Sequence, residues 1–338
     1  MATSERVDVG GQAVIEGVMM RSPRSFAVVC RRPDGSIVVK EAAWEPLWGR
    51  MKVLRAPFLR GAIVLLESLW NGLSALSFAA DQQTDAAAAP QSLGAAAAPK
   101  KGEALAKGLT LAASLALGLA FFVGVPHLLA WALGSVLGFD TSSVYFHLVD
   151  GVVKTLLLLG YLAAISRIPE IRRVFEYHGA EHKAIATYEH GLELTVANAR
   201  TQSRFHPRCG TSFLLIVVMV SVALFTALLR GVWMPTPAAD HAVKILIKLP
   251  LMFPIAGLAY ELIRLAGKKC DTSAWARIMS KPGMWLQKIT TREPADDQLE
   301  IALISIRKTL WRERAGAATT AAPVMVYASA AEVDLPLL

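Results

Sequence analysis

Four potential metal ligands lie close together in the sequence, between residues 178 and 209. His178 and His182 are four residues apart, so on a helix both imidazoles project from one face and can share one tetrahedral cation. His206 and Cys209 are three residues apart, which is typical of the compact turn that supplies half of many zinc sites. The mixture of nitrogen and sulfur ligands favours zinc among the divalent cations. The sequence therefore predicts a divalent-metal site formed by all four residues.

Two carboxylates could add catalysis to this site. Glu181 lies between the two helical histidines, and HGAEH at 178–182 matches the H-x-x-E-H pattern of inverted zinc metallopeptidases, in which the glutamate polarises the attacking water. The large soluble fold of those peptidases has no room in this chain. Glu16 lies among small and apolar residues in AVIEGVMM, where a carboxylate needs a partner. We keep two alternatives for Glu16, an ion pair with an arginine and a catalytic role.

The number of ligands separates two functions. If His178, His182, His206 and Cys209 all bind the cation, no coordination position stays open for water and the metal is structural. If one of them does not bind it, catalysis becomes feasible. The first hypothesis is a membrane metal-dependent hydrolase that acts on a lipid headgroup or a membrane-proximal peptide, with Glu181 or Glu16 as the base. The alternative is a non-enzymatic membrane scaffold or channel-like protein with a structural zinc site.

The composition places these residues in a membrane protein. Hydrophobic residues make up 54% of the 338 residues and charged residues 18%, and the apolar residues are grouped in long runs. We predict a mainly α-helical, polytopic membrane bundle with spans over 108–137, 152–165 with an outward continuation through 147–150, and 211–229, and a weaker span over 244–265. Residues 57–80 are predicted to form an interfacial or re-entrant helix, although a fifth crossing at 61–80 stays open.

The distribution of lysine and arginine predicts the orientation. Of the 35 basic residues, 31 lie in 1–107, 167–208 and 264–314, and none lies in 138–146 or 231–240. Since basic residues accumulate in cytoplasmic segments, both termini and the central connection 167–211 should face the cytoplasm from the inner membrane. The net charge of +8 reflects this asymmetry and not an aromatic-interleaved basic stripe, so no nucleic-acid partner is expected. The bilayer is the expected partner, and a homo-oligomer is left open.

The remaining segments fall into smaller units. The cytoplasmic region 1–56 should contain a β-hairpin, because two alternating runs flank the turn pair Asp34-Gly35. The alanine-rich linker 81–107 and the tail 315–338 have low complexity, and the tail should be disordered. The four-span unit covers 108–265, and the cytoplasmic region 266–314 should contain an amphipathic helix after Pro294 that packs on the hairpin.

Several charged residues fall within or beside the predicted spans. Asp150 and Lys154 are one helical turn apart and should form a pair or extend to the membrane surface. Lys244 and Lys248 belong to the same outer end of the bundle. We expect them to extend to the surface or to line a polar entrance.

Four sequence blocks carry a family resemblance. They are GGQAVIEGVMMRSP at 10–23, YHGAEHKAI with YEHGLELTVANAR at 177–200, SRFHPRCGTSFL at 203–214 and WLQKITTREPADDQLEIA at 285–302. In this order they resemble the YqhQ-like family of bacterial membrane proteins, a domain of unknown function described as predicted metal-dependent enzymes. The resemblance implies a site at His178, Glu181, His182, His206 and Cys209. It adds Glu16, Gln287 and Glu293 as polar members of the other blocks, and it implies no substrate.

Overall fold

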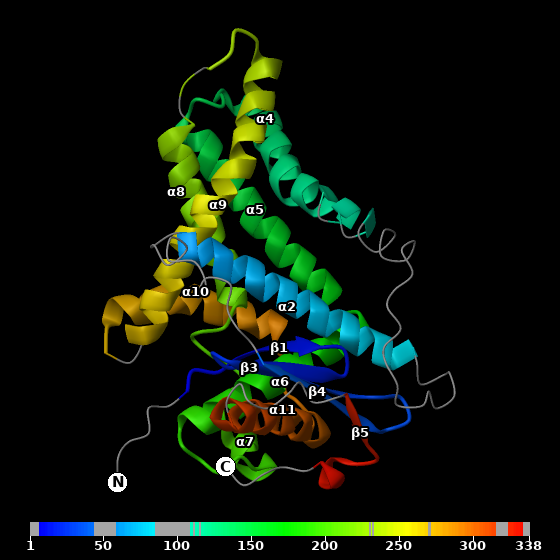
Figure 1. Cartoon of the computed structure of the whole chain (residues 1–338). Coiled ribbons are helices and arrows are strands. Elements are labelled where there is room, and N and C mark those ends of the chain that lie inside the picture. Colours follow the sequence, from blue (N-terminus) through cyan, green and yellow to red (C-terminus); the bar gives the residue numbers. More distant parts are fainter. Residues whose placement is uncertain are drawn as a thin grey trace.

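The computed structural model of the chain describes residues 7–43, 59–84, 109–110, 112–114, 116–229, 231, 233–269, 272–315 and 324–333. Most of these residues are helical, and the helices form a long bundle above a layer that contains a small β-sheet (Figure 1). Cys270 and most of the predicted linker 81–107 lie outside the described residues.

Within the described residues, four helices are long and apolar enough to cross a membrane, which is consistent with a membrane protein. They cover Ala112–Leu137, Val144–Ile165, Thr211–Leu228 and Pro237–Gly267. The first contains a π-helical segment, η3 (Ala120–Gly124), followed by α4 (Val125–Leu137), and the others are α5 (Val144–Ile165), α8 (Thr211–Leu228) and α9 (Pro237–Lys269). All four predicted spans are therefore present as helices.

Two of these helices begin earlier than predicted. α5 starts at Val144, where the Ser143 side chain accepts a hydrogen bond from the Tyr145 amide, three residues before the predicted continuation at 147–150. α9 starts at Pro237 and continues through Pro250 and Pro254. The charged residues that suggested later starts are instead enclosed by the bundle. Lys244 and Lys248 are only 1% and 0% exposed, so the prediction that they extend to the membrane surface was wrong.

The β-layer is a five-stranded antiparallel sheet in the order β1-β2-β3-β4-β5. The predicted hairpin is confirmed as β3 (Ser25–Arg31) and β4 (Ile37–Ala43), with Gly35 at a φ of 86° in the turn. β1 (Gly10–Val14) and β2 (Gly17–Arg21) extend the sheet on one side. β5 (Met325–Tyr327) pairs with β4 on the other side, so this part of the tail is ordered, contrary to the prediction.

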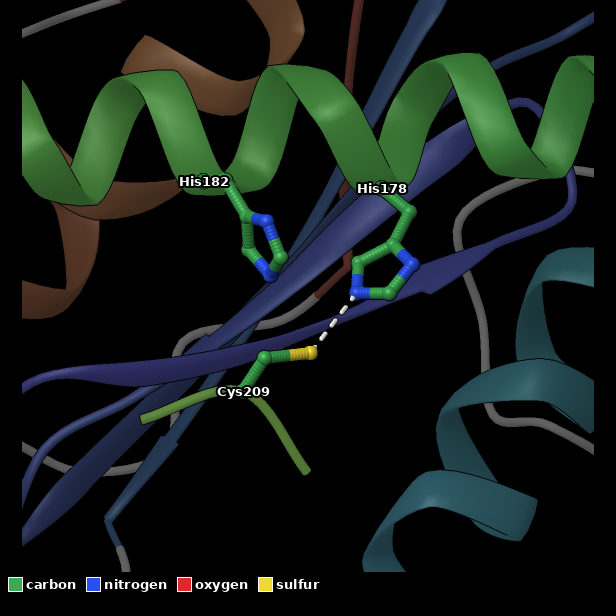
Figure 2. A group of neighbouring side chains, drawn as sticks. All are labelled: His178, His182 and Cys209. Atoms are coloured by element: carbon green, nitrogen blue, oxygen red, sulfur yellow. Dashed lines mark hydrogen bonds between the residues drawn. The ribbon is translucent and has the colours of Figure 1, made fainter. Parts of the chain in front are cut away.

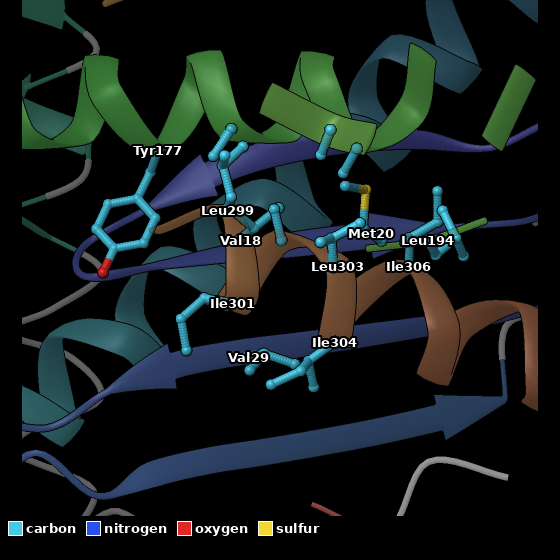
Figure 3. Packing of buried hydrophobic residues seen from close by; sticks show 14 of the residues in the cluster. Val18, Met20, Val29, Tyr177, Leu194, Leu299, Ile301, Leu303, Ile304 and Ile306 are labelled. Carbon is cyan, nitrogen blue, oxygen red and sulfur yellow. The ribbon is translucent and has the colours of Figure 1, made fainter. Parts of the chain in front are cut away.

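Helices cover both faces of the sheet. α6 (Pro169–Glu189) and α11 (Asp296–Ala315) pack on one face, and α2 (Leu59–Thr84) packs on the other (Figure 1). Val18 and Met20 face α11, whereas Met19, between them, faces Ala75 of α2. The short helix α7 (Val196–Thr201) also contacts α11, which is therefore buried on most sides and not only along one stripe (Figure 3).

α2 and α10 (Ala274–Thr290) lie where the bundle meets the β-layer. α2 contacts both α9 and the sheet, and in Figure 1 it lies between the bundle and the sheet. It is not among the four helices that are both long and apolar enough to cross a membrane. Both helices carry exposed tryptophans: Trp70 on α2 and Trp285 on α10 are 69% and 65% exposed. Tryptophan is enriched at membrane interfaces, so this placement agrees with the predicted interfacial helix, whose position in a membrane stays a prediction.

Candidate metal centre

α6 carries two of the predicted ligands on one face. The helix begins with Pro169 at its first position, and its two histidines point toward Cys209 (Figure 2). Gly179 lies between the two histidines, where a Cβ atom would be 2.0 Å from the Arg292 carbonyl oxygen. The glycine therefore lets the chain at 290–294 pass directly over α6, with the Arg292 amide donating to the Phe175 carbonyl.

Backbone carbonyl groups from two different segments fix the tautomers of both histidines. His178 Nδ1 lies 2.8 Å from the Thr290 carbonyl oxygen, and His182 Nδ1 lies 2.6 Å from the Arg204 carbonyl oxygen. A carbonyl oxygen can only accept, so each Nδ1 carries the hydrogen and donates it. Each Nε2 is then unprotonated, which is the arrangement that a hydrogen bond from the other ring nitrogen imposes on metal-binding histidines.

Cys209 completes a group of three donors. Its Sγ lies 3.3 Å from His178 Nε2, and ligand atoms of His178, His182 and Cys209 all lie within 4.8 Å of one another (Figure 2). The Thr211 hydroxyl is 3.2 Å from this sulfur, and the Thr211 amide donates to it at 3.5 Å. The structure therefore confirms that residues of two separate segments come together in a group that could bind a metal.

The burial of His182 suits a metal ligand. The side chain is 1% exposed, and its Nε2 has no hydrogen-bond partner among the described residues. Burial lowers the pKa of His182, which keeps the imidazole neutral. A buried nitrogen without a partner is costly unless something binds it, by about 1–3 kcal/mol.

His206 is adjacent to this group but is held elsewhere. Its Nε2 lies 3.2 Å from Glu189, which also forms an ion pair with Arg208. The Gln287 side chain accepts from the His206 amide and donates to its carbonyl oxygen, both at 2.8 Å. Burial acts to raise the pKa of the Glu189 carboxyl, but the hydrogen bonds from His206 and Arg208 lower it overall. The structure thus brings three of the four predicted ligands together and pairs the fourth with a carboxylate.

Glu181 is buried beside the metal group. It is 5% exposed, and the Gly11 backbone hydrogen-bonds to it. Burial raises the pKa of its carboxyl, against the opposing charges of His178 and His206. A Cβ atom on Gly11 would lie 2.8 Å from Glu181 Oε1, so this glycine makes room for the carboxylate. Such a group can hold a proton closer to neutral pH than an exposed glutamate can.

Glu181 opens onto a cavity of about 510 Å³ between the sheet and the bundle. β1 and β2 form one wall and α6 another, and residues of α2, α8 and α9 complete the lining. The lining includes His178, Cys209, Arg21, Tyr260 and Ile263. His182 and His206 line a second hollow that shares Glu181 and Arg21 with the first.

The structure places Glu16 away from this cavity. It lies at the β1–β2 turn with a φ of 51°, forms an ion pair with Arg173 and accepts from the Tyr177 hydroxyl at 3.3 Å. This geometry fits the ion-pair alternative. Glu293 forms an ion pair with Lys183, and its side chain is 66% exposed. It is therefore not part of the metal group either.

Sequence reasoning missed Arg21. It lies at the end of β2 and lines both hollows, and burial lowers the pKa of its guanidinium, against the opposing charge of Glu67. The feature of the sequence that could have identified it is a single arginine at the end of the apolar segment GVMMR. The carbonyl groups of Thr290 and Arg204, which orient the histidines, belong to the backbone, so no residue type in the sequence could predict them.

The comparisons with known proteins agree with the resemblance of the sequence blocks. Residues 56–312 match the family described as "Protein of unknown function (DUF1385)". The chain belongs to this family. It is also 33% identical over 305 residues to "Uncharacterized protein YqhQ" of Bacillus subtilis (strain 168), which covers 89% of this chain and 92% of that protein. No solved structure matches the chain significantly.

Proposed function

We propose that the chain is a membrane metal-dependent hydrolase whose cation is held by His178, His182 and Cys209. The observation that carries the proposal is the buried His182 Nε2. Its ring is oriented by a backbone hydrogen bond through Nδ1, and its free nitrogen lies beside two further donors. Two imidazole nitrogens and one thiolate suit zinc better than magnesium or calcium, which prefer oxygen ligands.

The number of donors favours catalysis. Three protein ligands leave one position of a tetrahedral zinc open, as in catalytic sites, whereas structural sites have four. A bound zinc ion supplies Lewis acidity and activates water at neutral pH. The cavity of about 510 Å³ beside His178 and Cys209 provides space for a substrate.

Residues of the chain supply the other functions that hydrolysis needs. Glu181 lines the same cavity and, with its raised pKa, would accept a proton from the attacking water and return it to the leaving group. Arg21 would bind an anionic group of the substrate, because its guanidinium supplies a cation on the β2 side of the cavity. Glu16 has no part in this scheme, since its carboxylate is paired with Arg173.

The position of the cavity indicates the substrate. Its walls include Tyr260 and Ile263 of α9 as well as residues of the sheet, so the cavity lies where the apolar helices meet the β-layer. A lipid headgroup or a membrane-proximal peptide would reach it. From the basic residues flanking the helices, we place the cavity and both termini on the cytoplasmic side of the inner membrane.

Substitution with cobalt(II) tests this proposal without a known substrate. The full-length protein in detergent should show visible d–d bands and a thiolate charge-transfer band, and added azide should shift the d–d bands because one position is open. His206→Gln should leave the spectrum and the azide response unchanged. A spectrum that azide does not alter, or that His206→Gln changes, would contradict the open three-ligand site.

One observation favours the structural zinc site as a second candidate. The ring centroids of His182 and His206 are 5.6 Å apart, so rotation of His206 away from Glu189 could bring a fourth ligand to the metal. A closed site would fasten α6 to the turn before α8. In that case cobalt would not respond to azide, and His206→Gln would lower both the metal content and the melting temperature.

A further inference from the structure

The helical bundle encloses a second group of titratable side chains, separate from the metal centre. Asp150 and Lys154 of α5 and Lys248 of α9 are all less than 8% exposed. Lys154 donates to Asp150 Oδ2 at 2.5 Å, and Lys248 donates to the same oxygen at 3.1 Å. Intramembrane ionisable residues are expensive and usually functional. The predicted pairing of Asp150 with Lys154 is confirmed, but it is only one part of a larger network.

Two histidines extend the network in one direction. Lys248 Nζ lies 3.0 Å from His127 Nδ1, and His127 Nε2 lies 3.1 Å from His241 Nδ1. Lys248 can donate to His127 Nδ1, so the hydrogen of His127 is then on Nε2 and points to His241. The result is a continuous chain of hydrogen bonds, His241–His127–Lys248–Asp150–Lys154.

The chain of hydrogen bonds starts near one end of the bundle and ends in its middle. His241 is in the first turns of α9 and is partly exposed. Lys248 and Lys154 lie about 15 Å along their helices from the same end, which is roughly half the thickness of a hydrocarbon core. Beyond Lys154, the buried Leu158, Leu162 and Leu286 form an apolar cluster. The network therefore opens toward one membrane face only.

The charges of the network do not balance. The buried titratable groups are His127 of α4, His147, Asp150 and Lys154 of α5, and Asp240, Lys244 and Lys248 of α9, with the partly exposed His241 at the mouth. Asp140 lies in the exposed loop before α5, and α8 contributes the Phe225 ring but no titratable group. With neutral imidazoles, three lysines face two buried aspartates. Losing one proton would make this group neutral, which burial favours.

Unpartnered atoms in the network also point to exchange with protons or water. Both ring nitrogens of His147 and Oδ1 of Asp150 are buried without a hydrogen-bond partner among the described residues. His147 and Asp150 are three residues apart on α5, so they lie on one face of the helix. Buried polar atoms of this kind are normally satisfied, and a proton or a water molecule is the smallest species that could do so.

We propose that this network is a proton relay that connects Lys248 and Asp150 to one membrane face. In the outward step, the Lys248 ammonium gives a proton to His127 Nδ1, the hydrogen on His127 Nε2 passes to His241 Nδ1, and His241 Nε2 releases its hydrogen to water. The network then loses one proton and one positive charge. The reverse step takes up a proton from the same face. The relay depends on the bundle crossing a membrane but not on the metal centre.

Nitrogen NMR of the full-length protein, labelled with ¹⁵N-lysine and reconstituted in lipid bilayers, tests the relay. The Lys248 signal, identified by its loss in Lys248→Met, should change from the ammonium to the amine position between about pH 5 and pH 10. If that variant does not fold, Lys248→Arg identifies the same signal and keeps the buried cation. His127→Phe should abolish the exchange of the Lys248 protons with water, because the ring keeps its shape but cannot pass a proton.

His190→Phe is the matched control. His190 ends α6 at the surface, where its Nδ1 lies 2.7 Å from Gln202 Oε1, so its loss should not alter the Lys248 signal. A Lys248 signal that stays at the ammonium position at every pH would overturn the proposal, and so would wild-type proton exchange in His127→Phe. Either result would show that the network is a fixed set of ion pairs.

Discussion

The two histidines of the candidate metal group differ from His206 in which ring nitrogen contacts the rest of the protein. His178 and His182 each commit Nδ1 to a backbone carbonyl oxygen and leave Nε2 for a cation. His206, in contrast, uses Nε2 to contact Glu189 and is fixed through its backbone by Gln287. The hydrogen-bond partner of each imidazole, and not its position in the sequence, therefore decides which histidines can bind the metal.

Metal binding should protect Cys209 from alkylation. In a Cys270→Ser background, Cys30 will not react, because it is fully buried and burial raises the pKa of its thiol to about 12. Cys209 lines the cavity, so iodoacetamide should modify it after a chelator removes the metal and not before. Mass spectrometry of the intact protein gives the number of modified thiols. Equal modification with and without chelator would show that Cys209 is not a ligand.

Glu313 should make the stability of the β-layer depend on pH. Burial acts to raise the pKa of its carboxyl, but hydrogen bonds from Arg24 and Ser22 lower it overall. A lowered pKa stabilises the fold above the ordinary carboxyl pKa, and this contribution is lost as the pH falls. Glu313→Gln should reduce the free energy of unfolding by about 1–2 kcal/mol at neutral pH. The difference should shrink below about pH 4 in thermal unfolding, whereas a constant difference would contradict this assignment.

The sequence predicted part of the site because part of it is local. The spacing of His178 and His182 depends only on helical periodicity, so it could be interpreted without a structure. The pairs His206–Glu189 and Glu16–Arg173 join different elements, and no spacing rule predicts them. Residue types and their spacing therefore suggested four ligands, whereas the tertiary contacts bring only three of them together.

At the scale of elements, the site depends on how closely two segments approach. The chain that leaves α10 passes over α6 at Gly179, which brings the Thr290 carbonyl oxygen to His178. A glycine in the middle of a helix lowers intrinsic helix stability, so its presence here reflects the close contact. The same passage explains why Gln287 can reach His206 from α10.

Gly179→Ala should disrupt this approach. The new Cβ atom would lie 2.0 Å from the Arg292 carbonyl oxygen, a backbone atom that can move away only together with the 290–294 segment. We expect a loss of about 1–3 kcal/mol in stability and weaker metal binding, because the Thr290 carbonyl oxygen would move from His178. Thermal unfolding and competition with a chelator measure the two effects.

Gly160→Ala is the control for that substitution. Gly160 is also helical, but a Cβ atom there would meet nothing within 4 Å. This variant should be as stable as the wild type or more stable, with unchanged metal affinity. If both alanine variants behaved alike, the contact at Gly179 would not be what holds the site together.

The elements differ in how well the sequence predicted them. The β3–β4 hairpin has a local signal in Asp34-Gly35, and the spans have one in their apolar length. β1 and β2 belong to a sheet covered on both faces, so their residues do not alternate between apolar and polar. β5 gave no signal because its strand forms only by pairing with β4, a distant segment.

At the scale of the molecule, the chain joins an apolar bundle to a polar layer through α2, α10 and the metal group. The bundle carries the buried ion network, and the layer carries the helix α6. The proposed orientation puts the β-layer and both termini on the cytoplasmic side and the 138–143 loop on the opposite side.

Accessibility labelling checks this orientation. In a background without native cysteines, Ser142→Cys should react with an impermeant maleimide added outside intact cells, because the loop before α5 lies at the far end of the bundle from the β-layer. Asp34→Cys and Ala331→Cys, on either side of the β4–β5 pair, should react only after the membrane is permeabilised. External labelling of both would reverse the proposed orientation.

The metal content of the purified full-length protein tests the central claim most directly. Elemental analysis should find one zinc or similar divalent ion per chain in the wild type and in His206→Gln, and little in His178→Ala, His182→Ala and Cys209→Ser. A wild-type protein without stoichiometric metal, or one in which His206→Gln loses the metal as completely as His182→Ala does, would contradict the three-ligand centre.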